Sequence, residues 1–93
     1  MSYNGWNNYE TWNVALWIDN DQGSQEWAQE LTQEYRHDDA WKLGQALKES
    51  LEEMMPDLGA SMWTDLLGAA WSEVDWTEIA EHYLEDLEPE EED

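Results

Sequence analysis

Carboxylates are the side chains in this sequence that could do chemistry. The chain holds 24 Asp and Glu residues against 3 Lys and Arg, which is a formal net charge of −21. Two regularly spaced sets are expected on helix faces: Glu26, Glu30 and Glu34, and then Glu78, Glu81, Glu85 and Glu88 with Asp86 beside them. Residues three or four apart stand above one another on a helix, about 4.5–6 Å apart along its axis. Such rows suit the binding of cationic groups on a partner protein.

The segment from Asp19 to Glu30 has part of the spacing of a calcium-binding loop. Asp19, Asp21 and Glu30 stand at the first, third and twelfth positions of a helix-loop-helix cation site. Gly23 occupies the fifth position, where an oxygen ligand belongs, and Ser24 the sixth, where the sharp turn requires Gly. We therefore favour a turn followed by a helix cap, and a specific calcium site stays as the minor alternative.

The remaining residues do not have the spacing of a catalytic or metal centre. Cys is absent, and His37 and His82 are too far apart in sequence to form a pair of ligands on one helix. Carboxylate pairs such as Glu52 and Glu53 are so frequent that they do not mark an active site. We expect no enzymatic activity, no cofactor and no metal.

The charge of the chain predicts the class of its partner. Solubility of a small domain needs a net charge of only about 2–8, so an excess of this size indicates a further role. The excess negative charge attracts cationic protein surfaces and repels nucleic acid and anionic membranes. No transmembrane run or signal-peptide pattern is found in the sequence. We expect a cytoplasmic protein that binds a basic, nucleic-acid-binding protein; the oligomeric state is not defined, and a homodimer stays open.

Apolar periodicity predicts that residues 1–88 form one compact all-α domain of four to five short helices, followed by a disordered acidic tail over residues 89–93. The helices are expected from Asn7 or Asn8 to Asp19, from Asp21 or Ser24 to Tyr35, from Ala40 to Met54, from Ser61 to Trp71, and from Asp75 to Pro89. The first helix has the widest apolar arc and should be the most buried.

Aromatic residues are predicted to provide the core. There are eight Trp and four Tyr, and each buried ring removes roughly 150–250 Å² from water. Trp12, Trp27, Trp76 and Tyr83 fit the inner faces of the helices. The other tryptophans are too many to bury together and are expected to line a docking surface for Arg-rich partners: Trp6, Trp17, Trp41, Trp63 and Trp71.

Residues 7–18, with the sequence NNYETWNVALWI, resemble a signature of small uncharacterised proteins of bacteriophages and other mobile elements. In overall character the chain is also similar to the DNA-mimic anti-restriction and anti-CRISPR proteins of phages, which are small, acidic and often helical. This resemblance implies an inhibitor in the host cytoplasm whose acidic helix faces occupy the basic groove of a host defence protein. The alternative is an acid-surfaced protein from a saline environment that binds partners through exposed tryptophans.

Overall fold

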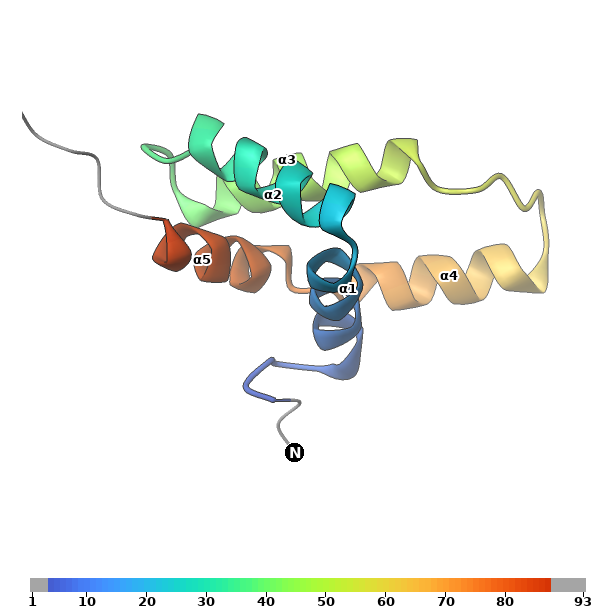
Figure 1. The fold of residues 1–93 in the computed structure, drawn as a ribbon. Helices are drawn as coiled ribbons and strands as arrows, with labels where there is room; N and C mark the ends of the chain where they lie inside the picture. The colour runs from blue at the N-terminus through green and yellow to red at the C-terminus, as the bar shows by residue number, and fades with distance from the viewer. Residues whose placement is uncertain (1–3, 88–93) are drawn as a thin grey trace, which may run out of the picture.

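The computed structural model describes residues 4–87, which form five α-helices (Figure 1). The helices are α1 (Tyr9–Asn20), α2 (Gln22–Glu34), α3 (Ala40–Glu53), α4 (Met62–Ser72) and α5 (Trp76–Asp86). The all-helical prediction is confirmed, with helix ends close to those expected. Glu88 and the predicted tail at 89–93 lie outside the described residues. Within residues 4–87, no helix is both long and apolar enough to cross a membrane.

Each helix begins at a polar residue that caps it. The side chain of the cap accepts a hydrogen bond from a backbone N–H three residues later, which satisfies a donor that the first helical turn leaves without a partner. The caps are Asn8, Asp21, Asp39, Ser61 and Asp75. Because these interactions are local, they explain why the starts of the helices could be predicted.

The centre of the core lies between α3 and α5. Leu43 and Leu47 of α3 and Ile79 and Ala80 of α5 are fully buried. The two helices approach closely at Gly44, where an added Cβ would lie 2.9 Å from the backbone carbonyl carbon and oxygen of Trp76. Only Gly therefore fits at this helix crossing.

The predicted tryptophan-rich core is wrong, because Trp76 is the only buried tryptophan among residues 4–87. The buried apolar set otherwise consists of Ala, Ile, Leu and Val. Trp6, Trp27 and Trp71 are partly buried and pack against this set from outside. Short helices enclose a narrow interior that aliphatic side chains fill, so these three indole rings cover its edge.

Trp12 and Tyr83, which were also expected in the core, are only partly buried. Trp17, Trp41 and Trp63 are exposed by 70%, 60% and 62%, as the docking-surface prediction requires of them.

Two further burial predictions are also wrong. Helix α1 is not more buried than α3 or α5, because each of these three helices contributes three buried residues and α1 leaves Trp17 exposed to solvent. The helical spacing of Leu47, Leu51 and Met54 predicts that Met54 lies on the inner face of α3, but Met54 caps the end of that helix and is 74% exposed. Periodicity places residues on a common face, whereas burial depends on how much of that face a neighbouring helix covers.

Helix α4 extends from the end of the bundle (Figure 1) and buries no residue. It is nevertheless rich in apolar residues, and Met62, Trp63 and Leu66 are all exposed. Its attachment is at its C-terminal end, where the Trp71 Nε1 donates to Glu52 Oε1 of α3 at 3.1 Å and the Trp71 ring lies 4.9 Å from that of Trp76.

Candidate acidic binding surface

Helix α2 turns one face to the core and an acidic face to solvent. Ala28 and Thr32 are buried, and the Thr32 hydroxyl donates to the carbonyl of Ala28 at 2.7 Å. Glu26, Glu30 and Glu34 are all exposed, and we call them the α2 acidic row. Their Cα atoms rise by about 6 Å at each step, because four residues separate successive members. The sequence of α2 contains no Lys or Arg.

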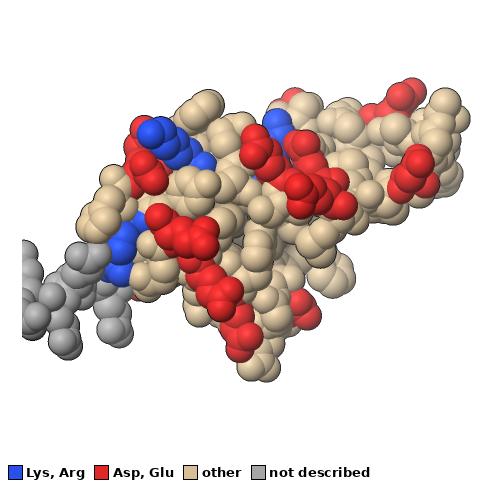
Figure 2. All heavy atoms as spheres, turned by 90° about the horizontal axis from the view of Figure 1, so that it is seen from above, with Lys and Arg blue, Asp and Glu red and all other residues tan. Residues whose placement is uncertain are grey.

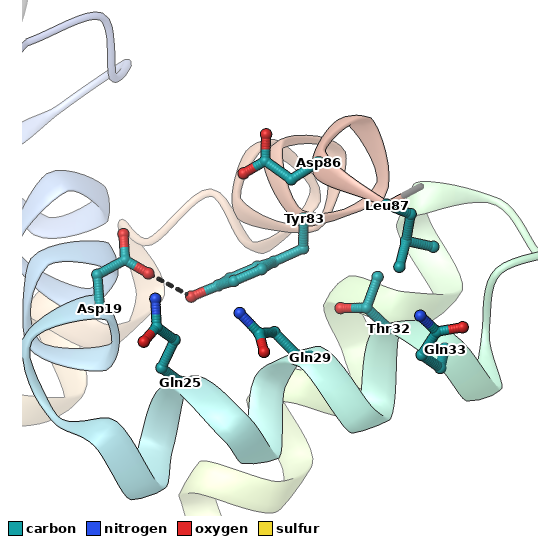
Figure 3. A pocket seen from close by; sticks show the side chains of 8 residues that line it. All are labelled: Asp19, Gln25, Gln29, Thr32, Gln33, Tyr83, Asp86 and Leu87. Atoms are coloured by element: carbon teal, nitrogen blue, oxygen red, sulfur yellow. Dashed lines mark hydrogen bonds between the residues drawn. The ribbon is translucent and has the colours of Figure 1, made fainter. Parts of the chain in front are cut away.

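A groove of about 450 Å³ lies beside this row, between the end of α1, α2 and α5 (Figure 3). Its lining comprises Asp19, Gln25, Gln29, Thr32, Gln33, Tyr83, Asp86 and Leu87. The Tyr83 hydroxyl donates to Asp19 Oδ1 at 2.7 Å, which holds the ring across the groove. Burial raises the pKa of Tyr83 well above its usual value, and the hydrogen bond to Asp19 and the charges of Asp19 and Asp86 raise it further.

The groove and the α2 acidic row form a continuous surface. Gln29 and Gln33 line the groove and also line a shallow depression with Glu26 and Glu30. Carboxylate and amide oxygens accept hydrogen bonds from guanidinium and ammonium groups, and an aromatic ring attracts a cation over its face. This surface therefore has the chemistry to bind Arg and Lys side chains.

The acidic residues of α5 form a separate surface. Glu81 and Glu85 are exposed, on the side of α5 that points away from its buried residues Ile79 and Ala80. Glu78 is only partly exposed, and its Oε1 accepts the backbone N–H of Asn7 at 3.0 Å. Asp86 is exposed and lines the groove instead. Among the described members of the α5 set, Glu81 and Glu85 thus lie on the outward face of α5, and only Asp86 joins the α2 surface.

The three basic residues lie on α3 and in the segment just before it: Arg36, Lys42 and Lys48. Figure 2 shows acidic side chains in several separate groups on one face, with the basic side chains among them. Lys42 lies 3.7 Å from Asp38 and Lys48 lies 3.9 Å from Glu52, in i,i+4 pairs that involve α3. Exposed pairs of this kind contribute little to stability. Neither of these two ion pairs includes a member of the α2 acidic row. Within the row, Glu26 Oε1 accepts a hydrogen bond from Gln22 Nε2 at 3.2 Å.

The loop required by the calcium hypothesis is not formed. Asp21 caps α2, which begins at the next residue, and its carboxylate accepts both the backbone N–H and the hydroxyl of Ser24. These hydrogen bonds lower the pKa of Asp21. Asp19 is bonded to Tyr83, and Glu30 lies on α2. Across the part of the chain that the structure describes, no three His, Asp or Glu side chains gather as metal ligands.

A family model described as "Family of unknown function (DUF7249)" matches residues 1–93. The chain belongs to this family. No curated protein and no solved structure matches it. Because the family has no assigned function, the function of this member has to be argued from its surfaces.

The NNYET segment at residues 7–11 has a structural role in this family member. Asn8 Oδ1 accepts the Thr11 N–H and hydroxyl, and Asn8 Nδ2 donates to the carbonyl of Glu73 at 2.7 Å. Asn7 Nδ2 donates to Asp75 Oδ2 at 2.7 Å. These bonds fasten the start of α1 to the junction of α4 and α5.

Sequence reasoning missed the groove as a site. Tyr83 was assigned to the core, Asp19 to a turn or cation loop, and the glutamines of α2 were given no role. The i, i+4, i+8 spacing of Gln25, Gln29 and Gln33 is a signal for one helix face, but it does not show that α5 lies opposite. Only the packing of α2 against α5 brings these residues together.

Proposed function

We propose that this protein is a DNA mimic that binds the basic surface of a nucleic-acid-binding protein and excludes nucleic acid from it. The observation that carries the proposal is the α2 acidic row, which is exposed along its whole length on a helix without basic residues. Like charges at i,i+4 cost a helix a few tenths of a kcal/mol per pair. Because the chain keeps this row of carboxylates in spite of its cost in helix stability, the row supports a role in binding.

The groove supplies a second element of the proposed mechanism. An Arg side chain of the partner would enter beside Tyr83 and hydrogen-bond to Asp19 or the glutamine oxygens, while neighbouring cations bind Glu26 and Glu30. Inhibition would be competitive and stoichiometric, and binding would weaken as salt rises because screening acts on both partners. The phage-like segment supports a host defence protein as the target.

The exposed tryptophans favour a second candidate, an acid-surfaced interaction module that is not a DNA mimic. Trp17 and Trp41 expose most of their surface on α1 and α3. Binding through these rings would be insensitive to salt, in contrast to binding through the α2 acidic row.

The test is competition. Host proteins captured by the chain at low salt are identified, and the binding of each to labelled duplex DNA is measured as the chain is added. We expect stoichiometric displacement of DNA, and an inhibitory concentration at least about tenfold higher for the variant E26Q/E30Q/E34Q. The control E49Q/E53Q/E73Q removes three other exposed carboxylates. Equal loss in both variants, or capture of proteins that bind no nucleic acid, would reject the mimic.

A further inference from the structure

The solvent side of α4 is a continuous apolar surface. At about 100° per residue, Met62, Trp63, Leu66, Ala69 and Ala70 fall within an arc of about 120°. All five are exposed, and we call them the α4 apolar stripe. Leu67 and Trp71 lie beside this arc on the side that turns back to the bundle, where Trp71 contacts Glu52 and Trp76.

The stripe lies in a sparsely charged part of the chain. Between Met54 and Trp71 the charged residues are Asp57 and Asp65, and there is no Lys or Arg. Asp65 falls outside the arc of the stripe on the helical wheel. A basic partner would be drawn to the acidic faces instead, and two copies of a chain with a charge of −21 repel each other less when both present this surface than when both present their acidic faces.

We infer that the α4 apolar stripe binds a second copy of this chain, with the two α4 helices antiparallel about a two-fold axis at Leu66. A two-fold interface must be complementary to itself, and the stripe meets this condition. Rotation about Leu66 places Met62 of one copy over Ala70 of the other, and Trp63 over Ala69. Each bulky side chain faces a small one, and Leu66 meets Leu66.

The area of the stripe sets the strength of the dimer. Burial of a Met or Leu side chain removes about 60–120 Å² of apolar surface from water, and burial of a Trp side chain removes about 150–250 Å². Together with exposed Met54 and Leu58 in the connection before α4, the surface offers on the order of 500 Å² per copy. A standard interface buries about 800 Å² per partner. The dimer therefore falls in the size class of weak, transient interfaces.

Dimerisation and the proposed inhibition are expected to respond to salt in opposite directions. Added salt screens the repulsion between two polyanions and does not weaken apolar contacts, so dimerisation strengthens as salt rises. Binding of the acidic faces to a basic partner weakens. The two proposals can thus fail independently.

Sedimentation equilibrium of the full chain tests the inference, over concentrations from about 1 μM to 1 mM at low and at 0.5 M salt. We expect a shift from the monomer of 11.0 kDa toward twice that mass, at lower concentrations in high salt. Trp63→Ala should weaken the dimer about tenfold or more. Trp17→Ala removes an equally exposed ring from α1 and should change it less than about twofold.

The register is tested by moving the bulky residue. In W63A/A69W the small and large positions are exchanged, so the antiparallel pairing is restored and dimerisation should recover relative to Trp63→Ala. A chain that stays monomeric in all conditions, equal loss in the two single variants, or no recovery in the exchange variant would overturn the proposed dimer. Circular dichroism confirms that each variant keeps its helices.

Discussion

The hydroxyl of Thr11 accepts the backbone N–H of Asp75 at 2.8 Å, joining residues that are 64 positions apart. The same hydroxyl donates to Asn8 Oδ1 at 2.6 Å. Thr11 is fully buried, so both functions of its hydroxyl are satisfied inside the protein. One side chain therefore couples the cap of α1 to the cap of α5, since Asn8 and Asp75 are the caps of these helices.

Replacing Thr11 by Val should lower the free energy of unfolding by about 1–3 kcal/mol, because the Asp75 N–H loses its partner in a position where water has little access. Urea unfolding measures the change. Thr11→Ser keeps the hydroxyl and should recover part of the loss. Thr77→Val is the matched control at a half-buried position, and a similar loss there would contradict a specific role for the Thr11 hydroxyl.

Substitution of two helical glycines by Ala should have opposite effects. At Gly44 the new methyl group would meet the backbone of Trp76, and separating α3 from α5 should cost about 1–3 kcal/mol. At Gly68 the added Cβ meets no atom within 4 Å, and Ala should stabilise α4 by about 0.5–1 kcal/mol. Thermal or urea unfolding of both variants checks the pair; the same sign for both would contradict the close packing at Gly44.

Neutralising the α2 acidic row should increase stability while it weakens partner binding. The triple variant E26Q/E30Q/E34Q removes two repulsive i,i+4 pairs, each worth a few tenths of a kcal/mol. We expect a higher midpoint of urea unfolding at low salt, with the gain shrinking as salt is added. Decreased stability would show that these carboxylates make favourable contacts that the row's exposure does not suggest.

Tyr83 should make the protein less stable at high pH. The pKa of Tyr83 is raised in the folded state, so above about pH 10 the unfolded chain releases the phenol proton while the folded chain keeps it. The unfolded state then binds fewer protons, and the free energy of unfolding falls as pH increases. The contribution of Tyr83 to the free energy of unfolding is fully present below about pH 9.

Unfolding curves of the wild type and of Tyr83→Phe between about pH 8 and 11 measure this effect. The variant should lose less stability over the alkaline part of the range, and spectroscopic titration should show one late-ionising tyrosine fewer. Parallel stability curves for the two proteins would mean that Tyr83 titrates normally.

Salt dependence of stability separates the mimic from the salt-adapted alternative. The core contacts between α3 and α5 are apolar, so we expect the chain to be folded at low salt, with melting temperature rising modestly as the carboxylate repulsion is screened. Circular dichroism melting from low to molar salt provides the measurement. A chain that unfolds at low salt would support the saline-environment alternative.

Local chemistry accounts for the parts of the fold that could be predicted. Helix starts were expected at Asn7 or Asn8, at Asp21 or Ser24, and at Asp75. The residues that cap these helices are Asn8, Asp21 and Asp75. The start of α5 shows where this reasoning stops. Asp75 and Glu78 have the spacing of a capping box, in which the Glu78 side chain would accept the Asp75 N–H. In the structure the Glu78 side chain accepts from Asn7 instead, and the Asp75 N–H donates to Thr11. Hydrogen-bond partners that are 64 or more positions away in sequence compete with partners in the same helical turn.

The amino-acid sequence alone determined the helices, their starts and the polyanionic surface, because caps, periodicity and charge depend on residues within about one helical turn of each other. Tertiary structure decided that Trp76 is buried while Trp63 is exposed, that Asp19 meets Tyr83, and that α4 lies outside the core. These outcomes depend on which helix faces meet. Five short helices compete to cover one small interior, and α3 and α5 fill its centre because Gly44 lets them approach most closely.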